Sequence, residues 1–211
     1  MADDRDGDLF EASLMLLAGS TGLQHAGAGR GRDLWSTVAA GAGTQLWVEF
    51  ETEPAAVRFA DLMLAVPDVR CWMRRRVAGI RRRYETFVVD VDTASPSSTV
   101  GRLRGEWTQN VGLLLGGDAA DELTLRTRAA AVWRSALLTA APRVSSAGLR
   151  LRERDRASVR LLVRAAQILG VTCHARNARG FQVIHVEGRD VITLLSTIRS
   201  SPVPAGRHHR G

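Results

Sequence analysis

Hydrophobic residues recur along this chain with two periods, one typical of helices and one typical of strands. A spacing of three to four residues predicts helices over residues 9–20, 54–66, 97–103, 126–141, 156–169 and 189–199. Alternation at every second residue predicts strands over residues 33–38, 45–52, 69–76, 84–92, 149–153, 171–176 and 181–187, with a shorter one around residue 144. Asp8 is predicted to cap the first helix, and Pro54 is a favoured first residue of the second. Each half of the chain is therefore predicted to run helix, two strands, helix, two strands, helix.

The second half of the chain repeats the first. The run AVRFADLMLAVPDVRCWMR, which begins at Ala56, aligns without a gap with SVRLLVRAAQILGVTCHAR, which begins at Ser158, at an offset of 102 residues (158 minus 56). Upstream, Ser13 aligns with Ser135 at an offset of 122 residues (135 minus 13), so the first copy has a longer loop. A period of this length is too long for a solenoid and indicates two related half-domains in one pseudo-symmetric body. The alternative is a chance similarity between two amphipathic helix and strand units.

This duplication predicts an α+β fold of two αββαββα units, each with an antiparallel sheet whose helices cover one face. The predicted boundaries are a first half at 1–104, a linker at 105–121, a second half at 122–201 and a disordered tail at 202–211. The two cysteines, Cys71 and Cys173, occupy equivalent strand positions and are expected to be buried residues rather than metal ligands or a disulfide.

The chain of 211 residues is strongly basic, and all 29 of its basic residues are arginines. This bias, together with the abundant alanine and glycine, is typical of a GC-rich genome such as an actinobacterial one. The net charge of +7 favours a polyanionic partner, although a solvated face is the commoner explanation of arginine runs. The first residues are acidic rather than basic, and no apolar run reaches the length of a bilayer span. We therefore expect a cytoplasmic protein with no membrane partner, with association with the nucleoid as a further option.

Strand alternation places charged side chains on the face of each sheet that the helices leave open. On the first sheet this face also carries Glu49, Glu51, Asp90 and Asp92, which are expected to form ion pairs with neighbouring arginines rather than an acid/base couple. On the second sheet the open face is basic. The candidate DNA-binding residues are Arg74, Arg76, Arg81, Arg82, Arg83, Arg150, Arg152, Arg154 and Arg176.

Four segments carry a resemblance to a known family. They are EASLMLLAGSTGL and QLWVEFETEPAAVRFADLML in the first copy, and AVWRSALLTAAPRVSSAGLRLRERD and SVRLLVRAAQILGVTCHARNARGFQVIHVEGRDVITLLSTI in the second. The chain resembles the LAGLIDADG fold of homing endonucleases and, more closely, the LAGLIDADG-like amino-terminal region of the WhiA sporulation regulators. The resemblance covers nearly the whole chain, and it rests on patterns more than on invariant residues.

The resemblance implies that the chain is not an enzyme. In LAGLIDADG nucleases an acid near the end of each motif helix holds the catalytic divalent cation. The aligned positions here are Ala18 and Ala140, which cannot bind a metal, and WhiA proteins lack these acids as well. WhiA proteins continue into a helix-turn-helix domain, whereas only a short basic tail follows Pro202, so we expect no sequence-reading module.

Other candidate chemistry is sparse, and we expect no cofactor. A four-residue turn at 177–180 would place His174 and His185 diagonally on one face of a hairpin. Two surface histidines without a third ligand do not predict a metal site.

Three hypotheses about function follow. The first is a non-catalytic, WhiA-like regulatory module involved in transcription, sporulation and cell division. Its candidate partners are DNA, bound weakly and without sequence preference, a WhiA-type regulator and a WhiB-type iron–sulfur protein. The second is a non-specific DNA-binding accessory protein that acts through the candidate arginines. The third is a degenerate homing endonuclease.

Overall fold

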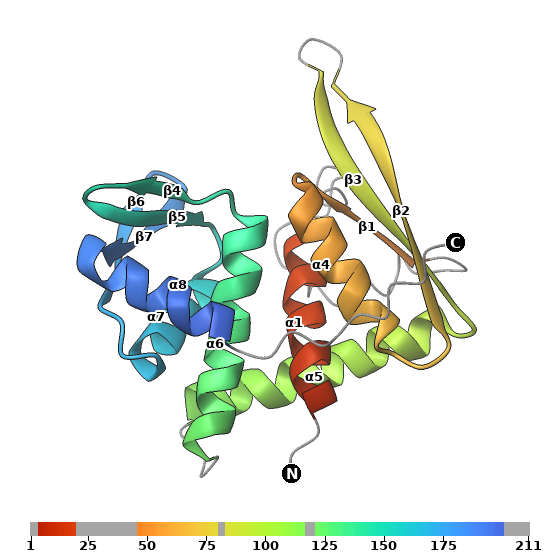
Figure 1. Cartoon of the computed structure of the whole chain (residues 1–211), viewed down its shortest axis with the longest axis horizontal. Coiled ribbons are helices and arrows are strands. Elements are labelled where there is room, and N and C mark those ends of the chain that lie inside the picture. Colours follow the sequence, from red (N-terminus) through yellow and green to blue (C-terminus); the bar gives the residue numbers. More distant parts are fainter. Residues whose placement is uncertain (1–3, 20–45, 80–82, 117–120, 201–211) are drawn as a thin grey trace.

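The computed structural model describes residues 4–19, 46–79, 83–116 and 121–200, which form six helices and seven strands (Figure 1). The first half contains α1 (Asp4–Gly19), β1 (Leu46–Phe50), α4 (Glu53–Leu64), β2 (Val69–Ala78), β3 (Tyr84–Thr93) and α5 (Pro96–Gly116). The second half contains α6 (Glu122–Thr139), β4 (Arg143–Ser145), β5 (Gly148–Glu153), α7 (Arg156–Ile168), β6 (Cys173–Ala178), β7 (Phe181–Glu187) and α8 (Gly188–Ser200). The strand predicted at 33–38 lies outside the described residues.

Each half contains one antiparallel sheet, and the two sheets have equivalent strand orders. The first sheet has the order β1-β3-β2, and the second has the order β4-β5-β7-β6, in which β5, β7 and β6 repeat the first arrangement. The duplicated α+β fold predicted from the sequence is therefore confirmed. Among the described helices, none is long and apolar enough to cross a membrane.

Helix starts follow the local capping chemistry, with two differences from the sequence prediction. The Thr52 hydroxyl accepts a hydrogen bond from the Ala55 backbone N–H and so caps α4, where Pro54 follows as expected. The Asp121 carboxylate caps α6 in the same way, so this helix begins at Glu122 rather than at residue 126. Because α1 begins at Asp4, Asp8 lies inside the helix and is not its cap.

α5 is much longer than the segment 97–103 that the sequence predicts. Val100 and Leu103 are buried in the core of the first half, Leu114 is buried in the core of the second, and Trp107 packs against both. The helix therefore runs beneath both halves (Figure 1). Residues 105–116, which the sequence assigns to a linker, are helical because tertiary burial outweighs their weak local pattern.

The hairpin of the second half is tighter than predicted. β6 continues to Ala178, which pairs with Phe181, so the turn consists of Arg179 and Gly180 alone. Gly180 has a φ of +78°, a left-handed conformation that glycine adopts without strain. The four-residue turn was therefore wrong, and as a consequence His174 lies directly opposite His185 rather than diagonal to it.

The two motif helices, α1 and α6, pack side by side and join the halves (Figure 1). Phe10 of α1 is buried in the core of the second half, and Leu138 of α6 packs against the core of the first. Small residues permit this close approach. At Gly19 an added Cβ would lie 2.6 Å from Cγ1 of Val48, so the end of α1 rests directly on β1.

Candidate nucleic-acid interface

The open face of the second sheet carries a row of basic side chains across all four strands. Arg143 of β4 lies opposite Arg150 of β5, which lies opposite His185 of β7, which lies opposite His174 of β6. The two arginines and His174 are exposed, and His185 is half-buried with its Nε2 3.2 Å from the Ala147 carbonyl oxygen. Like charges directly opposite each other, as Arg143 and Arg150 are, destabilise an isolated sheet, so this pair is better suited to an anionic ligand than to the stability of the free protein.

A second row lies beside the first. Arg152 of β5 and Arg176 of β6 both flank Val183 of β7, and both are exposed. The Arg152 guanidinium carbon lies 5.2 Å from the centre of the Phe181 ring, which fixes the charge over this face. Arg154, also exposed, follows directly after β5. The candidate arginines of the second half therefore gather on one surface, as the alternation predicts.

These arginines lack acidic partners among the described residues. Arg143, Arg150, Arg152, Arg154 and Arg176 form no ion pair within the described part of the chain. The acid nearest in register, Glu187, instead contacts His174 at 3.8 Å and Arg189 at 3.3 Å. The second-half face therefore presents positive charge that no described acid neutralises.

The first sheet differs because three of its arginines, Arg74, Arg75 and Arg76, are paired with acids. Arg74 Nε donates to Asp90 Oδ2 at 2.7 Å, and Arg76 Nη1 donates to Glu49 Oε2 at 3.5 Å, as the sequence predicts for these acids. The hydrogen bond and charge of Asp90 raise the pKa of Arg74 above its ordinary value. The neighbouring Arg75 pairs with Glu85.

The arginines near the tip of the β2–β3 hairpin are only partly described. Arg83 is exposed, whereas the candidates Arg81 and Arg82 lie outside the described residues. The hairpin itself projects beyond the helices (Figure 1).

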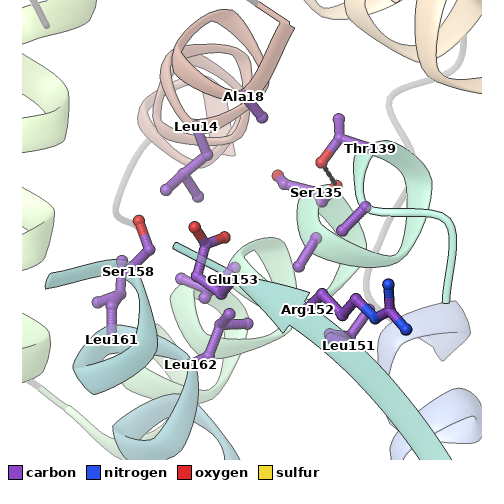
Figure 2. A pocket seen from close by; sticks show the side chains of 13 residues that line it. Leu14, Ala18, Ser135, Thr139, Leu151, Arg152, Glu153, Ser158, Leu161 and Leu162 are labelled. Atoms are coloured by element: carbon purple, nitrogen blue, oxygen red, sulfur yellow. Dashed lines mark hydrogen bonds between the residues drawn. The ribbon is translucent and has the colours of Figure 1, made fainter. Parts of the chain in front are cut away.

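The two alanines at which the sequence resemblance implies an absence of catalytic acids lie at the ends of the paired helices. Ala18 of α1 and Ala140, the residue that ends α6, line one small cavity of about 80 Å³ (Figure 2). Neither side chain can coordinate a cation. Over the described residues, there is no group of three or more histidine, cysteine or acidic side chains that could hold a metal ion.

Sequence reasoning missed the buried carboxylate of Glu11. Arg58 of α4 donates two hydrogen bonds to it, at 2.8 and 2.9 Å, and Arg134 of α6 donates a third. Arg134 also donates to the carbonyl oxygen of Ile198 at 3.0 Å. The signal in the sequence was a single acid within an otherwise apolar helical run.

The two cysteines are free and half-buried, each against the core of its own half. Burial raises the pKa of Cys71 to about 12 and that of Cys173 to about 11. Both thiols therefore stay protonated at neutral pH, which fits a packing role.

No family model matches this chain, and no curated protein matches its sequence. Among solved structures, the homing endonuclease I-DmoI in complex with DNA and Mn is 14% identical, with a TM-score of 0.49 over 94% of this chain and 99% of that one. Full-length WhiA from Thermotoga maritima is 10% identical, with a TM-score of 0.48 over 92% of this chain and 60% of WhiA. The N-terminal LAGLIDADG domain of WhiA is 10% identical, with a TM-score of 0.47 over 94% of this chain and 91% of that domain. The identities are low and all three TM-scores lie below 0.5.

Proposed function

We propose that this chain is a DNA-binding module without nuclease activity, which holds the phosphate backbone mainly through the open face of its second sheet. The observation that carries this proposal is the contrast between the two sheets. Arg150 and Arg176 are exposed and have no acidic partner in the described part of the chain, whereas Arg74 and Arg76 are paired with Asp90 and Glu49. An arginine that is already paired must give up a carboxylate to bind a phosphate, so it gains less from the contact.

Backbone contacts of this kind give affinity without direct sequence information. They neutralise phosphates and release counterions, so the binding constant falls steeply with salt. Arginine suits this role because its planar guanidinium binds phosphate oxygens in a bidentate manner. The proposal therefore predicts weak, salt-sensitive binding that differs little between duplexes.

The absence of nuclease activity is part of the proposal. Hydrolysis of a phosphodiester in this fold relies on carboxylate-held cations at the ends of the paired helices. Alanine occupies both positions, Ala18 and Ala140. The support for a non-catalytic role is therefore the lack of a carboxylate at these two positions. The same lack argues against a degenerate enzyme that retains activity.

The salt dependence of DNA binding tests the proposal with two variants of equal charge change. We expect Arg150→Ala with Arg176→Ala to lower the log–log salt slope by up to about 1.8, twice the value of roughly 0.9 per phosphate contact. Arg74→Ala with Arg76→Ala removes the same charge but should lower the slope by less than about 0.9. Fluorescence anisotropy on two unrelated duplexes across a salt series measures both slopes. Equal reductions, or a preference of more than about a hundredfold for one duplex, would contradict the proposal.

Within this function we propose a regulatory role of the WhiA type, in transcription, sporulation and cell division, with a WhiA-type regulator or a WhiB-type iron–sulfur protein as partner. The support is the resemblance of the motif-helix and strand segments to WhiA proteins. A pull-down from native cell extract, with and without nuclease treatment, tests the partner. We expect a regulator to be retained after nuclease treatment, and loss of every partner on that treatment would contradict the regulatory role while leaving DNA binding intact.

A further inference from the structure

The small cavity between the paired helices opens into a larger cleft. The cavity of about 80 Å³ and the cleft of about 530 Å³ share eight lining residues, among them Leu14, Ala18 and Ala140, so they form one continuous space. Leu17, Trp107 and other apolar side chains extend its walls. A cleft of this size with mainly apolar walls and a few polar groups is typical of small-molecule sites.

The hydroxyl groups of the cavity can only accept hydrogen bonds from a ligand. Ser135 donates its hydroxyl hydrogen to the Ala131 carbonyl at 2.9 Å, and Thr139 donates to the Ser135 carbonyl at 2.8 Å. Ser158 donates to the Asp155 carboxylate at 2.9 Å. Each hydroxyl therefore keeps lone pairs but no free hydrogen, because a hydroxyl has a single donor.

The formal charge that reaches the cavity is negative. The carboxylate of Glu153 points toward Leu14 and Ser158, whereas the guanidinium of Arg152 points away from them (Figure 2). Glu153 Oε1 accepts the backbone N–H groups of Arg154 and Asp155 at 2.7 and 3.0 Å, and its Oε2 has no hydrogen-bond partner among the described residues.

The outer cleft has the same sign of charge. Its lining includes four acids, Glu49, Glu51, Glu153 and Asp155, against two arginines, Arg152 and Arg154. Glu49 is paired with Arg76, so three acids face the two arginines. A cationic ligand is thus favoured both inside the cavity and at its entrance.

We propose that this cleft binds a small molecule with an apolar body and a cationic nitrogen donor, such as an alkylammonium group. The apolar part lies against Leu14, Leu161 and the alanines of the paired helices, and the ammonium donates to Glu153 Oε2. The site goes beyond DNA binding and does not depend on it. Its charged group, Glu153, lies on the opposite face of β5 from Arg150, although Arg152 and Arg154 belong both to the basic face and to the lining of the cleft. The truncated side chains at Ala18 and Ala140 leave the space that the ligand fills.

Three probes that share one apolar chain test the charge preference: octylammonium, octanol and octanoate. Isothermal titration calorimetry with the full chain should show octylammonium binding about tenfold or more tightly than octanoate, with octanol in between, because only the ammonium can donate a charge-assisted hydrogen bond to Glu153. Failure of octylammonium to bind, or equal binding of octanoate, would overturn the proposal.

Matched variants locate the site. Glu153→Gln keeps an oxygen for the two backbone N–H groups but removes the charge, so it should reduce the preference for octylammonium to less than about threefold. Ala18→Leu fills the cavity and should abolish binding of the amine, whereas Glu122→Gln removes an exposed acid of α6 and should leave it unchanged. Unaltered amine binding in Ala18→Leu or Glu153→Gln would contradict the site. Fluorescence anisotropy with a DNA duplex serves as the independent readout. Ala18→Leu and Glu153→Gln should both bind the duplex as tightly as the parent chain does.

Discussion

Glu11 illustrates, at the scale of single residues, how one buried carboxylate ties the two halves together. Its side chain is 1% exposed and receives Arg58 from α4 of the first half and Arg134 from α6 of the second. Burial alone would lower the pKa of Arg58, but the hydrogen bond and charge of Glu11 outweigh it and the pKa is raised. The three charges therefore stabilise one another only as a complete set.

We expect Glu11→Gln to destabilise the fold by about 3–5 kcal/mol, because it leaves two largely buried guanidinium groups without their common counter-charge. Urea denaturation followed by circular dichroism measures the loss. Glu122→Gln is the matched control, since Glu122 is exposed and pairs with Arg126 on the helix surface at 3.8 Å. The control should change stability by less than about 0.5 kcal/mol. A loss of under about 1 kcal/mol for Glu11→Gln would mean that the cluster does not hold the halves together.

The contrast between the two sheets also belongs to the residue scale. The same strand alternation exposes arginines in both halves, but Asp90 and Glu49 occur only in the first. Counted from the equivalent helix caps Thr52 and Asp155, an offset of 103 residues (155 minus 52), Glu49 corresponds to Arg152 in the second half. Differences at single positions between the two copies thus pair arginines with acids on the open face of the first sheet and leave the open face of the second sheet basic.

At the scale of elements, the packing of α1 against α6 determines where small residues are required. Ala12 of α1 is fully buried in the core of the first half, whereas Ala136 of α6 lines the cavity of about 80 Å³. The same enlargement should therefore have different costs at the two sites.

We expect Ala12→Leu to cost about 1–3 kcal/mol, because a well-packed core has no space for three further carbons. Ala136→Leu should cost less than about 1 kcal/mol, since its added atoms enter an existing void. Melting temperatures of the two variants and the parent chain give the comparison, with each kcal/mol worth roughly 2–4 °C in a chain of this size. A larger drop for Ala136→Leu would mean that the cavity is not available to the side chain.

At the scale of the whole molecule, the two half-domains share one interface, between α1 and α6, and one long helix, α5. α5 places Leu103 in the first core and Leu114 in the second, so neither half is complete without it. The interface between α1 and α6 borders an open cleft whose lining includes Ala18 and Ala140 together with several acids.

The purified protein should accordingly show no metal-dependent cleavage of DNA. Phosphodiester hydrolysis at this interface needs cations held by carboxylates at the two alanine positions. Incubation with supercoiled plasmid and magnesium or manganese, followed by gel electrophoresis, measures nicking. Ala18→Asp with Ala140→Asp is an informative companion, because any gain of cleavage on restoring the acids would show that their loss explains the inactivity. Nicking by the parent chain that is absent from a mock preparation would contradict the prediction.

The sequence by itself determined the features that depend on neighbours along the chain. Periodicity predicted the duplicated order of helices and strands, and alternation placed Arg74 on the same face as acids and Arg150 among other basic residues. The resemblance of the two motif segments to LAGLIDADG helices pointed to Ala18 and Ala140 without coordinates. These properties are local, since a side chain's face follows directly from its position within a helix or strand.

Only the tertiary structure decided the features that depend on contacts between distant segments. α5 is long because its far end is buried in the other half, and the register of His174 against His185 follows from a two-residue turn that alternation does not specify. The cluster around Glu11 joins residues 47 and 123 positions apart, and the cavity is lined by alanines from both halves. Burial and charge compensation are set by what packs together in space, and the order of residues along the chain does not contain that information locally.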